Sequence, residues 1–199
     1  MNKPLERFTI GDLFPKVTAG MLETSVAWKS ASDSARSLAS SRNKDIQAAL
    51  GPVKDQVNQA KSDVKAAEKS KDFAAAGAAD GRAKTGAIVQ GLLERLKDIG
   101  DRQEDMATAW SQAADQMRKF TDIDQAFDRY RTAGIARPGS GQPDNRLNAE
   151  GYEAFKNHAS SLKELGEALS QFGDKLSALG SDRLKFASEL EKGGHIKSR

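Results

Sequence analysis

Cysteine is absent from this 199-residue chain, which excludes disulfide bonds, thiolate metal sites and cysteine nucleophiles. Aromatic residues are scarce, at 6%. No run of about 18 apolar residues occurs, so the sequence predicts no membrane-spanning helix. Residues 1–15 lack the apolar core of a secretory signal. We therefore expect a cytoplasmic protein, and two alternatives stay open: association with a membrane, and export without a cleaved signal.

Sequence motifs for catalysis and for cofactor binding are also missing. The two histidines, His158 and His195, are preceded three residues earlier by Phe155 and Lys192, so no Glu-x-x-His pair for a di-metal bundle exists. The phosphate-binding pattern Gly-x-x-x-x-Gly-Lys does not occur. We expect no bound metal, no cofactor and no enzymatic activity.

Charged residues are plentiful, at 30%, but their signs nearly balance to a net charge of +3. No segment carries the dense Lys/Arg stripe of a nucleic-acid-binding protein, so we expect no nucleic-acid partner. The first helical segment is slightly basic, which would suit weak contact with an anionic surface.

The apolar residues recur at alternating spacings of three and four, which predicts amphipathic helices. We expect an all-α fold, an elongated antiparallel helical bundle or coiled coil of three long helices. Their predicted ranges are about 16–72, 82–133 and 146–192, within a single domain at 16–193 and before a flexible tail at 194–199. The clearest ladder of seam positions is Phe155, His158, Leu162, Leu165, Leu169, Phe172, Leu176 and Leu179.

Glycine and proline mark the expected breaks. Residues 134–145 contain two prolines and three glycines, which no helix should cross. Glycines recur at positions 77, 81, 86 and 91, which predicts either close helix contacts or a flexible turn, and we place the turn near 75–82. Gly51-Pro52 falls inside the first helix, where proline removes a backbone hydrogen bond, so a kink or break is expected there.

The seam of the first helix is poor in large side chains, which suggests completion by a partner or a second copy. Its predicted positions include Leu38. Four seam positions are polar: Thr24, Arg42, Gln103 and Arg183. Polar seam residues can fix register or oligomeric state at a cost in stability, and we hypothesise that role here.

Residues 1–15 form a distinct apolar or amphipathic segment. Its bulky side chains in a polar frame are the candidate contact residues for a partner or a membrane: Leu5, Phe8, Ile10, Leu13 and Phe14. Such a segment can fold back on the bundle, insert into a membrane interface or bind in a partner's groove. The sequence leaves these alternatives open.

The outline of three long helices after an apolar segment is similar to membrane-curving BAR domains. The stretch from Glu164-Leu165 through Phe172 to Leu179-Gly180-Ser181 resembles the first BAR helix of sorting nexins, although it lies at the opposite end of the chain. Storage-granule phasins and helical secreted bacterial proteins share the outline. None of these likenesses rests on a residue-specific motif, so none assigns functional residues.

The sequence therefore favours a non-enzymatic coiled-coil interaction or scaffold protein that binds protein partners along its helices and self-associates. One alternative is a peripheral protein on a membrane or lipid surface, BAR-like or phasin-like in outline. A second alternative is a secreted helical effector or accessory protein.

Overall fold

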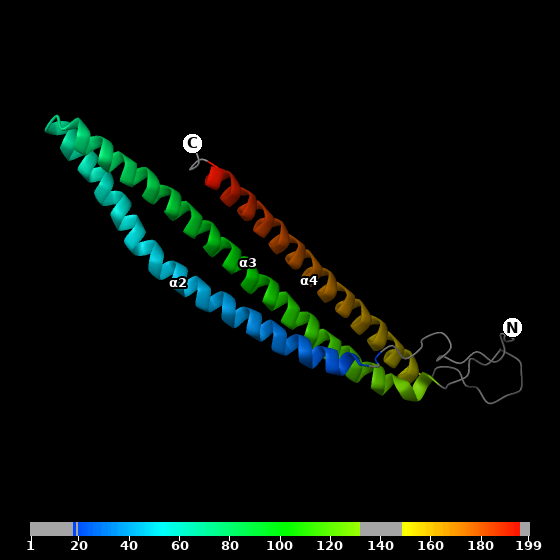
Figure 1. Cartoon of the computed structure of the whole chain (residues 1–199). Coiled ribbons are helices and arrows are strands. Elements are labelled where there is room, and N and C mark those ends of the chain that lie inside the picture. The colour runs from blue at the N-terminus through cyan, green and yellow to red at the C-terminus, as the bar shows by residue number, and fades with distance from the viewer. Residues whose placement is uncertain (1–17, 19, 132–148, 196–199) are drawn as a thin grey trace, which may run out of the picture. The chain divides into compact units, whose positions relative to one another are not determined.

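The computed structural model describes residues 18, 20–131 and 149–195, which form three long α-helices (Figure 1). Helix α2 is Met21–Lys69, α3 is Phe73–Arg131 and α4 is Ala149–His195. None of the described residues lies in a β-strand. The predicted all-α bundle of three long helices is confirmed.

The three helices contribute to two compact units. Unit 1 contains Met1–Asp33 and Thr108–Asp174, and unit 2 contains Ser34–Ala107 and Lys175–Arg199. Each unit therefore contains a section of every helix, and each has its own side-chain contacts.

A tight turn at residues 70–72 joins α2 to α3. The amide of Asp72 donates to the carbonyl of Ala67 and that of Lys71 donates to Glu68, which is the Schellman arrangement of a helix end. Lys71 adopts a left-handed conformation, with φ of 57°. The Asp72 side chain then accepts a hydrogen bond from the Ala75 amide, at 3.0 Å, and caps α3.

Residues 75–82, where the sequence predicts a turn, are helical instead, and α3 begins at Phe73 rather than near residue 82. Two residues after the end of α2, Lys71 adopts a left-handed conformation that glycine usually occupies. The glycines that suggested the turn lie inside α3. One of them, Gly86, is a close helix contact, because an added Cβ would stand 2.6 Å from Cγ2 of Val57.

Helix α2 continues without a break through Pro52. A proline inside a helix leaves the carbonyl four residues earlier, that of Ala48, without its amide partner. Both residues lie on the exposed side of α2, where water can bind that carbonyl. Figure 1 shows that the ribbon of α2 bends in this region, so the sequence correctly anticipated a distortion.

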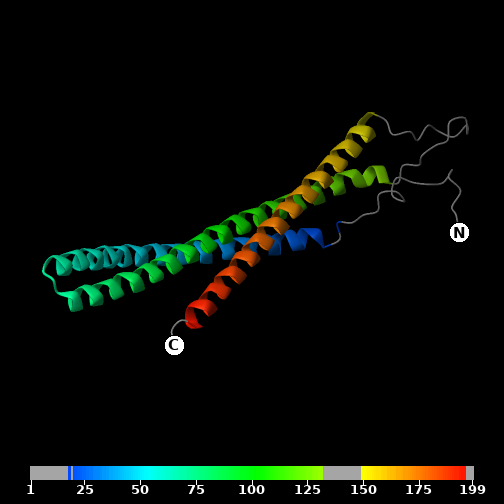
Figure 2. The ribbon, with the colours of Figure 1, turned by 90° about the horizontal axis from the view of Figure 1, so that it is seen from above.

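In unit 2, α2 and α3 run antiparallel. Asp63 of α2 pairs with Arg82 of α3, and further from the turn Asn43 bonds to Asp101. Residues with higher numbers in α2 therefore lie beside residues with lower numbers in α3. Figures 1 and 2 both show the two helices side by side from the turn onward.

Helix α4 lies antiparallel to α3 in the same unit. Arg95 pairs with Glu189 at 2.5 Å, and Arg102 pairs with Asp182 at 2.5 Å. Figures 1 and 2 agree that the α2–α3 hairpin extends past the C-terminal end of α4.

The predicted seam of α2 is partly wrong. Leu38 is 65% exposed, whereas the neighbouring Ala39 is fully buried. The buried positions recur every seven residues, at Ser25, Ser32, Ala39 and Ile46. Three of these four side chains are small, and small side chains allow close approach of helices. The prediction is therefore one position off at Leu38, whereas the predicted seam positions Ile46, Val57 and Ala60 are buried.

Of the four predicted polar seam residues, Gln103 occupies a buried position. Its Nε2 donates to the carbonyl of Ala35 at 3.4 Å, and its Oε1 accepts from Arg183 at 3.0 Å. One glutamine therefore links all three helices within unit 2, as a register-setting residue would. Thr24 and Arg42 are exposed.

Unit 1 contains both tryptophans and a cluster of buried large side chains. Met117, Phe120 and Leu165 form its buried core cluster, and Met21, Trp28 and Leu169 pack against it. Beside them, the rings of Trp28, Trp110 and Phe172 are in mutual contact, with centroids 5.5–6.0 Å apart. The three residues are half-buried, and ring contacts of this kind stabilise a folded unit beyond the area that they bury.

Candidate functional site

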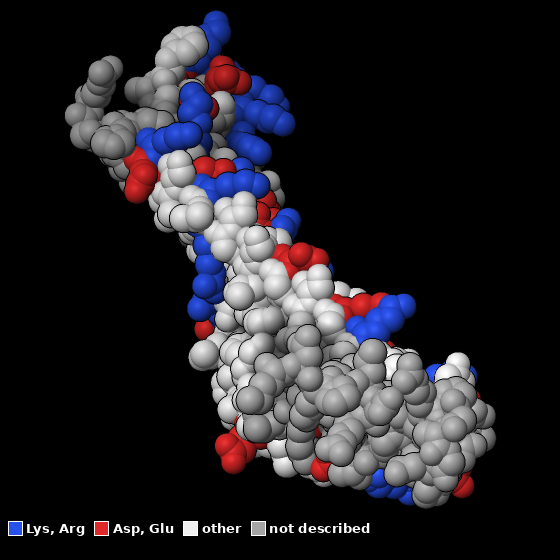
Figure 3. All heavy atoms as spheres, turned by 90° about the vertical axis from the view of Figure 1, so that its right-hand side faces the viewer, with Lys and Arg blue, Asp and Glu red and all other residues white. Residues whose placement is uncertain are grey.

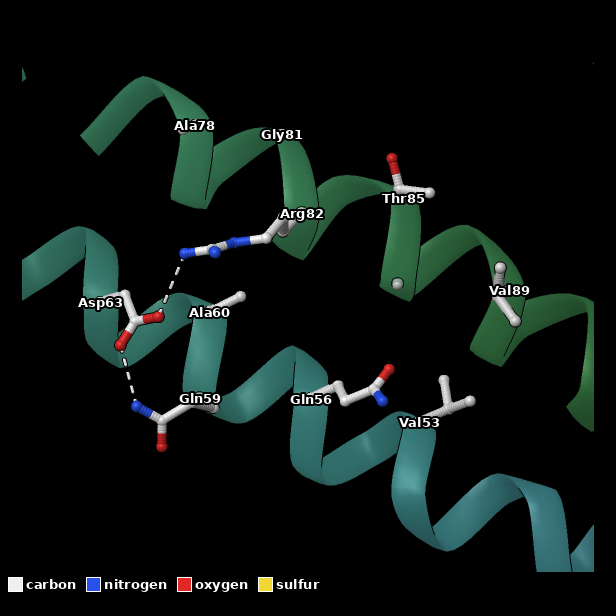
Figure 4. Close-up of a pocket in the computed structure, with 11 residues that line it drawn as sticks. Val53, Gln56, Gln59, Ala60, Asp63, Ala78, Gly81, Arg82, Thr85 and Val89 are labelled. Carbon is white, nitrogen blue, oxygen red and sulfur yellow. Dashed lines mark hydrogen bonds and ion pairs between the residues drawn. The ribbon is translucent and has the colours of Figure 1, made fainter. Parts of the chain in front are cut away.

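An open groove of about 750 Å³ lies between α2 and α3 in unit 2 (Figure 4). Its lining comes from two short sections of these helices that face each other near the turn. These residues are Val53, Gln56, Gln59, Ala60, Asp63, Ala78, Gly81, Arg82, Thr85, Gly86 and Val89. We call this feature the hairpin groove.

The shape of the hairpin groove follows from the small side chains on its walls. Because Gly86 lacks a side chain, Val57 of α2 contacts the backbone of α3 directly. Ala79 and Ala83, which are buried, continue this close contact along α3. Helices α2 and α3 therefore pack closely at the base of the groove, and the small side chains on its walls leave it open.

Polar groups are concentrated at one end of the groove. Asp63 accepts hydrogen bonds from Arg82 at 3.2 Å and from Gln59 at 2.8 Å, as Figure 4 shows. All three groups are in contact with water, so the ion pair contributes little to stability. Asp63 and Arg82 are the charged residues of the lining, and they satisfy each other. This arrangement suits binding of an apolar surface better than it suits acid–base chemistry.

Unit 2 also carries surface charge pairs whose titration is perturbed. The pKa of Glu94 is lowered because its carboxylate accepts a hydrogen bond from Gln90 and, secondarily, because Lys54 lies near it. The pKa of Lys97 is raised by its hydrogen bond to Asp101, at 2.7 Å. Figure 3 shows Lys and Arg interspersed with Asp and Glu on the described part of one face.

A second candidate lies in unit 1, where three polar side chains are buried together. Asp124 is fully buried, and its Oδ2 accepts a hydrogen bond from the Thr18 hydroxyl at 2.9 Å. Its Oδ1 lies 2.9 Å from Nε2 of His158. The imidazole ring stacks on Phe127, with centroids 4.8 Å apart, and contacts Phe120 at 5.2 Å.

This buried triplet differs from a nucleophile-activating site in its connectivity. In such a site the histidine lies between the hydroxyl and the carboxylate. Here the carboxylate lies between them, so the Thr18 hydroxyl donates to Asp124 rather than to the imidazole. The triplet joins residue 18, α3 and α4, and we interpret it as a structural link within unit 1.

The candidate residues from the sequence, Leu5, Phe8, Ile10, Leu13 and Phe14, lie outside the described residues.

The sequence reasoning missed the hairpin groove because it assigned residues 75–82 to a turn. A signal was nevertheless present. Ala78, Gly81, Thr85 and Val89 continue the three-and-four spacing of the middle helix toward its N-terminus.

No helix among the described residues is both long enough and apolar enough to cross a bilayer. No cluster of three or more histidine, aspartate or glutamate side chains suited to a metal ion occurs in the described part of the chain. Comparisons with protein-family models, with curated proteins and with solved structures each gave no match.

Proposed function

We propose that this chain is a non-enzymatic interaction protein that accepts a helix of a protein partner in the hairpin groove. The observation that carries the proposal is the open groove itself. It lies between α2 and α3 and is lined mainly by small and apolar side chains. Helix α4 ends before it reaches this part of the hairpin. Helical segments commonly dock in such grooves through residues spaced three and four apart.

The exposed apolar residues around the groove support the same proposal. Val89, which lines it, is 41% exposed, and the neighbouring Ile88 is 65% exposed. Phe73, at the start of α3, is 77% exposed. Covering these side chains with a partner helix would remove apolar surface from water, at about 25 cal/mol per Å².

The proposal is tested by placing a photo-crosslinking amino acid at Thr85 in the full-length chain. The matched control carries the same amino acid at Ala87, which is exposed on α3 and does not line the groove. After irradiation in an extract of the source cells, we expect the Thr85 variant to be linked to a protein through a helical segment of that protein. Equal labelling from both positions, or none from either, would contradict the proposal.

A further inference from the structure

The hairpin groove continues the surface on which α3 binds α4. In unit 2, Ile99 and Gln103 face α4, because Ile99 lies with Asp182 and Phe186 around one hollow and Gln103 bonds to Arg183. Moving toward the turn in steps of three or four residues along α3 leads from Ile99 through Leu96 and Leu92 to Val89, Thr85, Gly81 and Ala78. Residues at these spacings share one face of a helix. The groove is therefore the unoccupied part of a helix-binding stripe.

Helix α4 covers only the far part of this stripe. Glu189 of α4 pairs with Arg95 of α3, and the helix ends at His195, less than two turns further on. The groove residues of α3 begin at Val89 and extend to Ala78. Figures 1 and 2 show this part of the hairpin beyond the end of α4.

The side chains of the stripe are small on one side of Thr85 and large on the other side. Thr85 lies midway between Gly81 and Val89, and also midway between Ala78 and Leu92. The small residues Ala78 and Gly81 lie on the side toward the turn, and the large residues Val89 and Leu92 lie on the other side. A helix running in the opposite direction and carrying the same stripe would place its large residues against the small ones. Such alternation of large and small residues is how facing layers fill space.

We propose that the occupant of the hairpin groove is the hairpin groove of a second copy of this chain. A two-fold axis passing near Thr85 would pair Val89 with the other copy's Gly81 and Leu92 with its Ala78. Two α2–α3 hairpins then form a four-helix arrangement in which each copy presents the same patch. The inference rests on the proposed function and names the partner for the same site.

The polar residues of the lining fit this arrangement. Gln56, Gln59 and Asp63 belong to α2. Arg82 lies in α3 beside the stripe, and its side chain extends toward Asp63. An apolar centre with a polar margin is the usual composition of a protein interface. Because the central residues are small and few, we expect a dimer whose population depends on concentration.

The absence of cysteine from the chain permits a direct test with single-cysteine variants of the full-length protein. Thr85→Cys places a thiol at the proposed two-fold axis, and Ala87→Cys places one elsewhere on the exposed surface of α3. Under mild oxidation, we expect the Thr85→Cys chain to form a disulfide-linked dimer in preference to the Ala87→Cys chain. Mixing Gly81→Cys with Val89→Cys should give the mixed dimer in preference to either like pair.

Light scattering of the unmodified chain provides an independent measurement. We expect its mass to rise with concentration from 21.4 kDa toward twice that value. Thr85→Lys, at an exposed helical position, would place two positive charges together at the axis and should keep the mass at the monomer value. Circular dichroism of this variant should match the parent chain, which separates loss of association from loss of folding.

The outcomes distinguish this inference from the proposed function. A monomer at all concentrations without preferential linkage at Thr85 overturns the second copy as occupant. If the photo-crosslink at Thr85 still captures a helix of another protein, the proposed function stands alone. A dimer that is linked equally through Ala87 overturns the two-fold arrangement. Failure of both the disulfide and the photo-crosslink at Thr85 overturns both proposals.

Discussion

Replacing Gly100 of α3 by alanine should destabilise the protein, although alanine is normally the better helix former. An added Cβ would collide with the amide oxygen of Asn43 and stand 2.8 Å from its Cγ. The Asn43 side chain would have to rotate away. It would then lose the hydrogen bonds from its Nδ2 to Asp101, at 2.8 Å, and to Glu104, at 3.2 Å.

The magnitude follows from two opposing contributions. Hydrogen bonds to charged groups contribute about 1.5–3 kcal/mol each, and the water around these two reduces that to about 1 kcal/mol each. Displacing the carboxamide adds to this loss, whereas glycine to alanine in a helix gains about 1 kcal/mol. We expect a net loss of about 1–2 kcal/mol in the free energy of unfolding.

Gly91 of α3 supplies the matched control. It lies in the same helix, and an added Cβ there would meet nothing within 4 Å. Gly91→Ala should therefore raise the free energy of unfolding by up to about 1 kcal/mol. The two glycine variants should differ in opposite directions from the parent chain.

Chemical denaturation followed by circular dichroism at the helical band measures these changes. The decisive comparison repeats Gly100→Ala in an Asn43→Ala background, where the collision no longer exists. There the same substitution should become stabilising, as at Gly91, which gives a coupling between the two positions. If Gly100→Ala has the same effect in both backgrounds, the proposed contact between Asn43 and Gly100 is refuted.

Three further changes test other features. Lys71→Gly should raise the free energy of unfolding by about 1 kcal/mol, because glycine adopts the left-handed conformation without steric cost, and an unchanged denaturation midpoint would contradict this. Asp124→Ala should lower it by about 3 kcal/mol in denaturation experiments, because His158 loses its buried carboxylate partner; a loss below about 1 kcal/mol would show that the pair is not structurally important. Gln90→Ala should raise the pKa of Glu94 in an NMR titration, because the carboxylate loses its main hydrogen bond, and an unchanged pKa would refute that cause. In the parent chain, the stability due to this lowered pKa is present above the ordinary carboxyl range and is lost as the pH falls through the folded-state value.

The helical fold was predictable because the spacing of apolar residues reports the helical period directly. The predicted ladder on α4 places His158, Leu165 and Leu179 correctly at buried positions. Its members Leu162 and Leu176 are each 48% exposed. Helix ends were harder, because the α2–α3 turn depends on backbone hydrogen bonds and on Lys71 in an unusual conformation. Asp72 is a residue type typical of a helix start, but Lys71 is not the glycine that such a helix end usually contains.

The candidate site was less predictable, because a groove is defined by the side chains that are missing from it. Gly81 and Ala78 appeared in the sequence as signs of flexibility, whereas in the structure they line the hairpin groove. The same difficulty applies to Ala39, whose burial depends on close approach of a neighbouring helix rather than on its own size. The sequence predicted that Gln103 is a seam residue. Its hydrogen bonds to Ala35 and Arg183 could be identified only from the structure.

Helix α3 packs against α2 with one face and against α4 with another, and this restricts how its length can change. In unit 2, Ala79 and Ala83 are buried toward α2, while Ile99 and Gln103 face α4. One inserted residue would rotate every later position by about 100° around the helix axis and would exchange parts of the two faces. An insertion of about seven residues would nearly restore both faces. Any natural relatives that differ in the length of this hairpin should therefore differ by whole heptads, with compensating heptads in α2.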